Sequence, residues 1–334
     1  FDRVAKERVL QSLRAISRQT WKRLAAELAA YAMQRGSTDV PLAAFLRDQR
    51  IALDDVYRSK GHWIALKRAA GLPALPEGPD EAYLGGNLRT LLHANDSARL
   101  VTWGALAKAP FDAPSNPDVR TRRIAQMLAY QLYADRKHVM DDAAFLQRLQ
   151  GHPALCVELG ELAAHLDELS DLEGHALPGC PADWPLTLHG CYEIREILTA
   201  VGWLRGDRRS PFQAGVLAIA DEKIELMFVT LDKREGYHER IAYHDYAISP
   251  TRFHWQTQNA AGPDTMSGRR YLESDHNGWT FQLFVRESRE HPYCALGPVV
   301  LESAEGDRPM SIVWSLQVPL PVEMYRRFSV LRGG

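Results

Sequence analysis

The chain has little of what marks a membrane protein or a disulfide-rich protein. Apolar residues make up 46% of its 334 positions, yet no apolar run approaches the roughly 20 residues that a membrane-spanning helix needs. Its four cysteines, Cys156, Cys180, Cys191 and Cys294, form no C-x-x-C pair and no regular spacing with histidine. We therefore expect reduced thiols, no disulfide framework, no zinc site, no membrane partner and a cytoplasmic location.

The usual signatures of catalysis are also missing. The sequence contains no glycine-rich phosphate loop, no nuclease motif and no paired carboxylates that can be placed on a helix. Cys294 follows His291 by three residues, which is weak evidence for a nucleophile and its base. His238, His244 and His254 lack metal-ligand spacing. We expect no cofactor, no metal, and neither ATPase nor nuclease activity from this chain alone.

The chain as a whole carries almost no excess of either positive or negative charge. The formal net charge is −2, although residues 1–70 carry 14 Lys and Arg against 7 Asp and Glu. A strongly basic half would indicate non-specific affinity for nucleic acid, and there is none. A nucleic-acid role must therefore rest on a local patch or on neighbouring domains.

Helical periodicity covers the first half of the chain. In the segment after Thr20, an apolar stripe that includes Trp21, Leu24 and Leu28 lies at helical spacing, and Gly36 follows as a C-terminal breaker. Residues 141–172 predict one long helix with an apolar stripe formed by Leu155, Leu159, Leu162, Leu166 and Leu169. Such stripes are far more often core than function.

The pattern changes across Gly174–Pro181, where we place the domain boundary. Short runs rich in β-branched and aromatic residues follow, and we expect strands at 215–219, 224–230, 241–248, 252–257, 279–286, 299–302 and 310–316. The predicted fold class is α+β: an N-terminal all-helical domain (1–175) followed by a bent mixed β-sheet or small barrel (185–334). A sheet that closes on itself is the expected form.

The most informative stretch is 243–258, which places aromatic rings, a carboxylate, amides and imidazoles on successive strands. This mixture suits a flat ligand with polar edges, such as a nucleobase. Asp245 is the best single candidate, because a carboxylate inside an aromatic run is costly unless it is paired or exposed in a pocket. We predict that the base is bound by Tyr243, Asp245, Tyr246, Ser249, His254, Trp255, Gln256 and Gln258.

Cationic side chains close to this stretch could bind the DNA backbone. The predicted residues are Lys233, Arg252, Arg269 and Arg270. Each site residue also has a structural interpretation: the aromatic rings can fill a core, the glutamines can be solvated, and 259–271 can be a surface hairpin.

The β half resembles the C-terminal domain, long labelled only as of unknown function, that follows many bacterial superfamily II helicases. The matching segments are Gly190–Leu198, Leu226–Lys233, Tyr243–Ser249, Phe253–Gln258, Leu283–Glu287 and Pro309–Trp314. The opening Phe1–Leu10 resembles the junction at which the helicase core of those proteins ends. It carries no initiator Met and no signal peptide, so we expect an excised C-terminal fragment of a longer cytoplasmic protein.

The resemblance implies a function. The best-understood relatives look like ATP-dependent type IV restriction enzymes, with a phospholipase-D-type nuclease, a helicase-like translocase, a helical coupler and a terminal target-recognition domain resembling the SRA fold. By that resemblance, residues 1–175 are the coupler. Residues 185–334 would read 5-methylcytosine in double-stranded DNA by base flipping, in cis with the helicase and nuclease domains of the parent chain.

Two other functions fit the same residues. The β domain could be a non-catalytic protein-docking module that holds the nuclease or helicase, in which case a flat apolar patch is expected. It could also be a PUA-like RNA-binding module.

Overall fold

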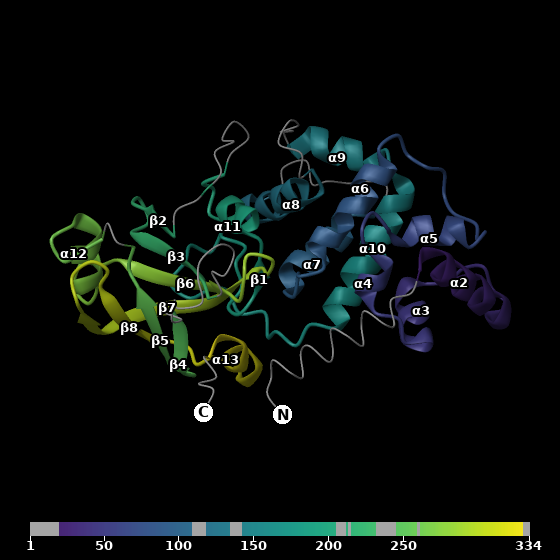
Figure 1. Ribbon diagram of the computed structural model, residues 1–334. Coiled ribbons are helices and arrows are strands. Elements are labelled where there is room, and N and C mark those ends of the chain that lie inside the picture. Colours follow the sequence, from purple (N-terminus) through teal and green to yellow (C-terminus); the bar gives the residue numbers. More distant parts are fainter. Residues whose placement is uncertain are drawn as a thin grey trace, which may run out of the picture. The chain divides into compact units, whose positions relative to one another are not determined.

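The structure is a computed structural model that describes residues 20–108, 118–133, 142–204, 212, 215–231, 245–258 and 261–329. These residues form two compact units (Figure 1). The first draws its described residues from Phe1–Leu92, Arg99–Asp118 and Leu128–Leu169, and the second from His93–Ala98, Val119–Met127 and Ser170–Gly334. The second unit therefore includes two short segments that precede the expected boundary at Gly174–Pro181.

The N-terminal region is helical, as predicted. None of the described helices is both long and apolar enough to cross a membrane. The helices are α2 (Trp21–Arg35), α3 (Leu42–Gln49), α4 (Leu53–Val56), α5 (Trp63–Ala69), α6 (Glu81–Asn87), η1 (Leu88–Leu91), α7 (Ser97–Leu106), α8 (Val119–Leu132), α9 (Asp142–Gln150) and α10 (Pro153–Glu168).

Helix α2 confirms the expectation from periodicity. Leu24 and Leu28 of the predicted stripe are buried, and Gly36 ends the helix in the left-handed conformation at φ 66°. The Thr20 hydroxyl accepts the N–H of Arg23 at 3.3 Å and so caps the first turn.

The predicted helix over 141–172 is two helices. Helix α9 ends at Gln150, and α10 starts at Pro153, because a proline has no N–H to satisfy and its fixed φ suits the first turn of a helix. Helix α10 ends at Glu168, so Leu169 lies outside the buried stripe and is 62% exposed. The prediction for Leu169 was wrong.

Helix α10 carries two carboxylates that cap other helices of the same unit. Helices α3 and α5 have no capping side chain of their own. Glu158 accepts the backbone N–H groups of Trp63 at 2.6 Å and Ile64 at 3.0 Å, and Glu161 accepts that of Leu42 at 2.6 Å. These bonds satisfy N–H groups that the first turn of a helix leaves unpaired.

The second unit contains a mixed eight-stranded sheet, so the predicted α+β class is confirmed. The order is β2-β3-β6-β7-β8-β5-β4, with β1 paired to β7; β3 and β6 are parallel, and the other pairs are antiparallel. The strands are β1 (Cys191–Tyr192), β2 (Val216–Ile219), β3 (Ile224–Thr230), β4 (Tyr246–Ser249), β5 (Arg252–Gln256), β6 (Thr280–Arg286), β7 (Tyr293–Glu305) and β8 (Ser311–Leu316).

The sheet is strongly curved but is not a closed barrel, which corrects the expectation of a sheet closing on itself. Within the described ranges, the terminal strands β2 and β4 are not hydrogen-bonded to each other. Curvature nevertheless brings the Gln258 amide, just after β5, close to Gly215, just before β2: a Cβ on Gly215 would lie 2.8 Å from the amide nitrogen. The side chain of Gln258 therefore approaches the β2 end of the sheet, where a closed barrel would have a pair of hydrogen-bonded strands.

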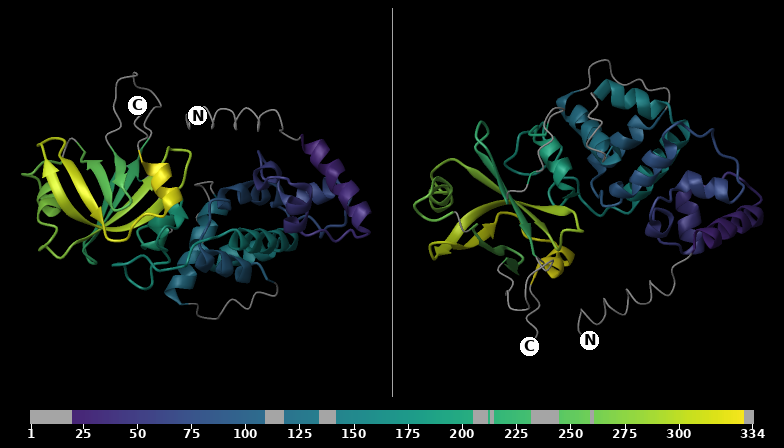
Figure 2. Two further views of the ribbon diagram at one scale, coloured as in Figure 1. Left: turned by 90° about the horizontal axis from the view of Figure 1, so that it is seen from below. Right: turned by 45° about the horizontal axis from the view of Figure 1, so that its top comes forward.

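Alternating residues give the sheet two apolar faces, and each face is covered (Figure 2). Helices α12 (Met266–Leu272) and α13 (Val322–Phe328) contribute side chains to the core on one face, and α11 (Ile194–Ala200) contributes to the core on the other. Tyr271 of α12 and Phe328 of α13 join the first core, with Phe253, Trp255, Phe281 and Trp314. Ile197 of α11 joins the second, with Phe228, Phe284 and Tyr293.

One covalent link was not expected. Cys191 of β1 and Cys294 of β7 are direct partners in the antiparallel register, with Cα atoms 4.1 Å apart, and they form a disulfide. The expectation of four reduced thiols was therefore wrong for this pair. The two cysteines are 103 residues apart, so only the strand pairing reveals their proximity.

Candidate functional site

The β4–β5 hairpin presents the predicted site residues on two sides. Tyr246 pairs with His254 across the hairpin, and Ala247 pairs with Phe253. Ala247 and Phe253 are buried in the core, whereas Tyr246 and His254 are partly exposed. Side chains alternate along both strands, which separates the hairpin into a core side and an outer side.

On the outer side, two aromatic rings form a stack. The rings of Tyr246 and His254 lie 5.2 Å apart between centroids, at an interplanar angle of 25°. The Nε2 atom of His254 lies 2.6 Å from the hydroxyl oxygen of Ser311 on β8, which fixes the plane of the imidazole. We call the side formed by Tyr246, His254, Gln256 and Ser311 the outer face of β4–β5–β8; Gln256 is the register partner of Ser311.

Asp245 lies on the core side, just before β4, and is only 5% exposed. Its carboxylate accepts the backbone N–H of Gln256 at 2.8 Å. The cost of burying the charge is thus met at least in part by a backbone donor. The carboxylate fastens the start of β4 to the end of β5, directly beside the Tyr246–His254 stack.

The other predicted base-binding residues differ in burial: one lies in the core and two have exposed surface. Trp255 points into the core, where its ring makes an edge contact with Tyr271 at 5.4 Å between centroids. Ser249 is partly exposed at the end of β4 and accepts the N–H of Thr251 at 3.3 Å. Gln258 is exposed near Gly215. Tyr243 lies outside the described residues.

The predicted backbone-binding cations have different environments. Arg270 forms an ion pair with the buried Glu225 of β3, and its guanidinium lies 4.2 Å from the ring centroid of Trp279. Arg269 is exposed and donates to the carbonyl of Asp264 at 3.2 Å. The segment 259–271 was expected to be a loop or surface hairpin, but its last six residues, from Met266 to Tyr271, belong to helix α12.

Two further arginines of the described sheet region, Arg252 and Arg308, form exposed ion pairs. Arg252 forms an exposed ion pair with Glu302 of β7. Arg308 pairs with Asp264, and this hydrogen bond lowers the pKa of the Asp264 carboxyl. Exposed pairs of this kind contribute little to stability, so an anionic ligand could exchange for either carboxylate at small cost. Lys233 lies outside the described residues.

The C-terminal segment has a family match. Residues 186–328 match the model of a family described as Domain of unknown function (DUF3427). The match spans 143 residues (186 to 328) of the 334 in the chain. No curated protein matches the chain. The resemblance inferred from the six segments is therefore supported at the level of the domain, and the description names no activity.

The matched segment, residues 186–328, contains every predicted site residue and several that the sequence did not single out. Ser311 belongs to an alternating strand, where its hydroxyl was indistinguishable from a solvated one. Thr257 is buried and links two segments: its hydroxyl donates to the Ala261 carbonyl and accepts the Met310 N–H, each at 2.9 Å. Glu225 lies within an apolar run and could have been recognised as a charge that needs a partner.

In the described part of the chain, no group of three or more His, Cys, Asp or Glu side chains is arranged to bind a metal ion. What the outer face of β4–β5–β8 does offer is a stacking surface, an imidazole, a hydroxyl and an amide on neighbouring strands. These groups can bind and orient a flat polar ring.

Proposed function

We propose that residues 185–334 form the DNA-recognition module of a modification-dependent, type IV restriction enzyme, and that they bind 5-methylcytosine in duplex DNA by base flipping. The observation that carries the proposal is the Tyr246–His254 stack on the outer face of β4–β5–β8. Stacking a base on an aromatic ring contributes about 1–3 kcal/mol to binding. A flipped base extends this stack, while polar groups beside it take the base edge.

In this proposal Gln256 and Ser311 supply edge contacts, because an amide and a hydroxyl each offer a donor and an acceptor. Asp245 is a positioning residue: its bond to the Gln256 N–H holds the strand that carries the stack. Arg269 supplies a phosphate contact, since it is exposed and donates to the Asp264 carbonyl. Arg270 is engaged by Glu225 and acts on the fold of α12.

What we propose for the rest of the parent protein is based only on the resemblance of the sequence segments. The helical region would couple recognition to a helicase-like translocase and a phospholipase-D-type nuclease in the same chain. Recognition itself needs no catalytic group in this fragment, so the module is proposed to bind without reacting.

The test is an equilibrium titration of the fragment against duplexes that differ only at one cytosine. Cytosine, 5-methylcytosine and 5-hydroxymethylcytosine are compared by fluorescence anisotropy at fixed salt. Burying one methyl group contributes about 1 kcal/mol, so we expect about fivefold tighter binding of the methylated duplex.

A matched RNA hairpin is the second arm of the titration. Preference for RNA over both DNA duplexes would favour the PUA-like function. Absence of binding to any nucleic acid would replace the proposal with the protein-docking module.

A further inference from the structure

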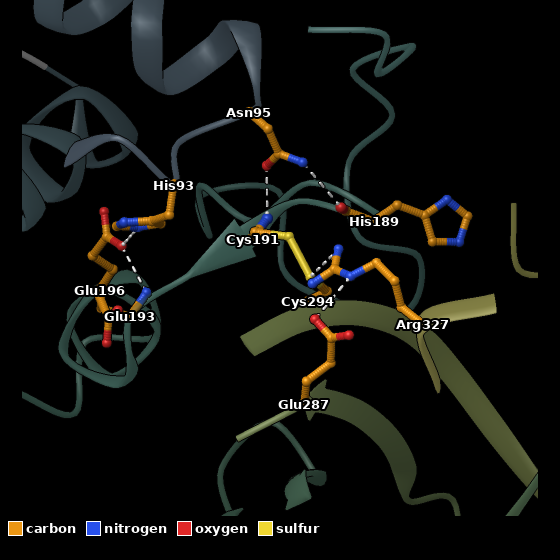
Figure 3. The surroundings of a disulfide bond; sticks show 9 residues. All are labelled: His93, Asn95, His189, Cys191, Glu193, Glu196, Glu287, Cys294 and Arg327. Carbon is orange, nitrogen blue, oxygen red and sulfur yellow. Dashed lines mark hydrogen bonds and ion pairs between the residues drawn. A yellow bond between two sulfur atoms is a disulfide. The ribbon is translucent and has the colours of Figure 1, made fainter. Parts of the chain in front are cut away.

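The two sulfurs of the Cys191–Cys294 disulfide have unequal surroundings (Figure 3). Cys191 retains 7% of its exposure, whereas Cys294 is completely buried. Both residues are buried, but only Cys191 retains exposed surface, which favours an approach from its side. The backbone N–H of Cys191 donates to the Oδ1 atom of Asn95 at 2.8 Å, which holds this side of the bond in place.

A cation lies next to the other sulfur. The Nη1 atom of Arg327, on α13, is 3.9 Å from the Sγ atom of Cys294. The same guanidinium bonds Glu287 at 3.2 Å through Nε, which keeps it aimed at the disulfide. A positive charge stabilises a thiolate, and a disulfide opens faster when the departing sulfur is the more stable thiolate.

We propose that the Cys191–Cys294 pair is a directional thiol–disulfide exchange site, at which a small thiol attacks Cys191 and Cys294 leaves as a thiolate beside Arg327. Exposure and charge favour the same direction of attack. The product is a modification site: Cys191 carries the small thiol as a mixed disulfide.

The attacking thiolate forms a bond to the Cys191 sulfur, the Cys191–Cys294 bond breaks, and its electron pair passes to the Cys294 sulfur. With a monothiol the first product is the mixed disulfide, and a brief exposure followed by acid traps it before a second thiol or Cys294 attacks it. With a dithiol, the second sulfur attacks the first, Cys191 departs as a thiolate that takes a proton from solvent, and the reductant becomes a cyclic disulfide after supplying two electrons.

The experiment traps the first product in the folded fragment. The fragment is oxidised, exposed briefly to glutathione, quenched with acid, alkylated after denaturation and mapped by peptide mass spectrometry. We expect glutathione on Cys191 and the alkyl group on Cys294. Glutathione mainly on Cys294, or four free thiols in the oxidised fragment, would overturn the proposal.

Variants at Arg327 separate electrostatics from loosening of the fold. Arg327→Met removes the charge and is expected to slow reduction by dithiothreitol severalfold, whereas Arg327→Lys retains most of the wild-type rate. The matched control is Arg326→Met, in the same turn, whose side chain pairs with Glu323. If Arg327 were only structural, its loss would expose the disulfide and speed reduction, and that result would contradict the proposal.

Discussion

The carboxylate of Asp245, the residue before β4, accepts the backbone N–H of Gln256, the last residue of β5, at 2.8 Å. The most conspicuous charge in the sequence is therefore part of the strand pairing. In the proposed site Asp245 would act on a ligand through the position of Tyr246, the next residue, and not through direct contact. Substitutions at Asp245 must be chosen with the hairpin in mind.

Asp245→Ala is expected to lower the free energy of unfolding by about 1–3 kcal/mol, because the Gln256 N–H loses its acceptor in a buried setting. Asp245→Asn keeps an acceptor oxygen and is expected to cost less. Urea unfolding of the two variants checks the order. Equal stability of Asp245→Ala and wild type would show that the bond contributes nothing to the hairpin.

The two neighbouring arginines of α12 are expected to behave differently. Arg270→Met leaves Glu225 buried without its ion pair and should lower stability by about 3 kcal/mol or more. Arg269→Met should change stability by less than about 0.5 kcal/mol, because Arg269 is exposed. In DNA titrations at several salt concentrations, Arg269→Met should reduce the salt slope by about 1, for methylated and unmodified duplexes alike. Similar losses of stability in both variants would contradict this division.

In the helical unit, Glu158 and Glu161 provide a matched pair for measuring capping by a distant carboxylate. Glu158 is 0% exposed and also lies 2.9 Å from Nδ1 of His62. Glu158→Ala is expected to cost about 3–5 kcal/mol, because it removes one partner of a buried polar network. Glu161→Ala should cost about 1 kcal/mol, the usual value of a cap. Thermal unfolding of both variants tests this ranking. A smaller loss of stability in Glu158→Ala than in Glu161→Ala would contradict it.

His189 gives the second unit a predictable response to acid. Burial lowers the pKa of its imidazole below the usual 6.5. Above that value the histidine is neutral in both states and costs nothing; as the pH falls below it, the unfolded chain binds a proton that the folded chain resists. Stability is therefore lost on acidification from about pH 6.5 toward the lower folded pKa.

His189→Asn isolates this effect, because asparagine tolerates the left-handed backbone at φ 64°. We expect the wild type to lose more stability than His189→Asn between pH 7.5 and pH 5.5 in urea unfolding. His165, whose pKa is also lowered by burial, is present in both proteins and cancels in the difference. Parallel pH profiles would exclude His189 as the cause.

The sequence predicted what depends on local pattern. The stripe of α2 with Gly36 at its end, and the alternation around Trp255, follow from the periods of helix and strand. The break before Pro153 was predictable in principle, since Gly151 and Pro153 punctuate the helical pattern, but the apolar stripe outweighed them. The identity of the core-facing side of β5 was likewise available from Phe253 and Trp255.

Contacts between residues far apart in the sequence could not be predicted from local sequence patterns. Nothing local to Cys191 indicates that Cys294 is opposite it, because register is set by the whole sheet. Glu225 and Arg270 are separated by 45 residues, and Glu158 and Trp63 by 95, so their pairing appears only after folding. The residue types of the candidate site are visible in the sequence, whereas the distant partners that tie Asp245 and Arg270 into the fold are not.

The most direct test of the account is the ratio of dissociation constants for unmodified and 5-methylcytosine duplexes, measured for wild type, Tyr246→Leu and Tyr83→Leu. Tyr83 is an exposed tyrosine of α6 and serves as the matched control. We predict a ratio of about 5 for wild type and Tyr83→Leu, and a ratio near 1 for Tyr246→Leu with an unchanged circular-dichroism spectrum. A ratio near 1 in the wild type, or an undiminished ratio in Tyr246→Leu, would contradict the assignment of modified-base recognition to the outer face of β4–β5–β8.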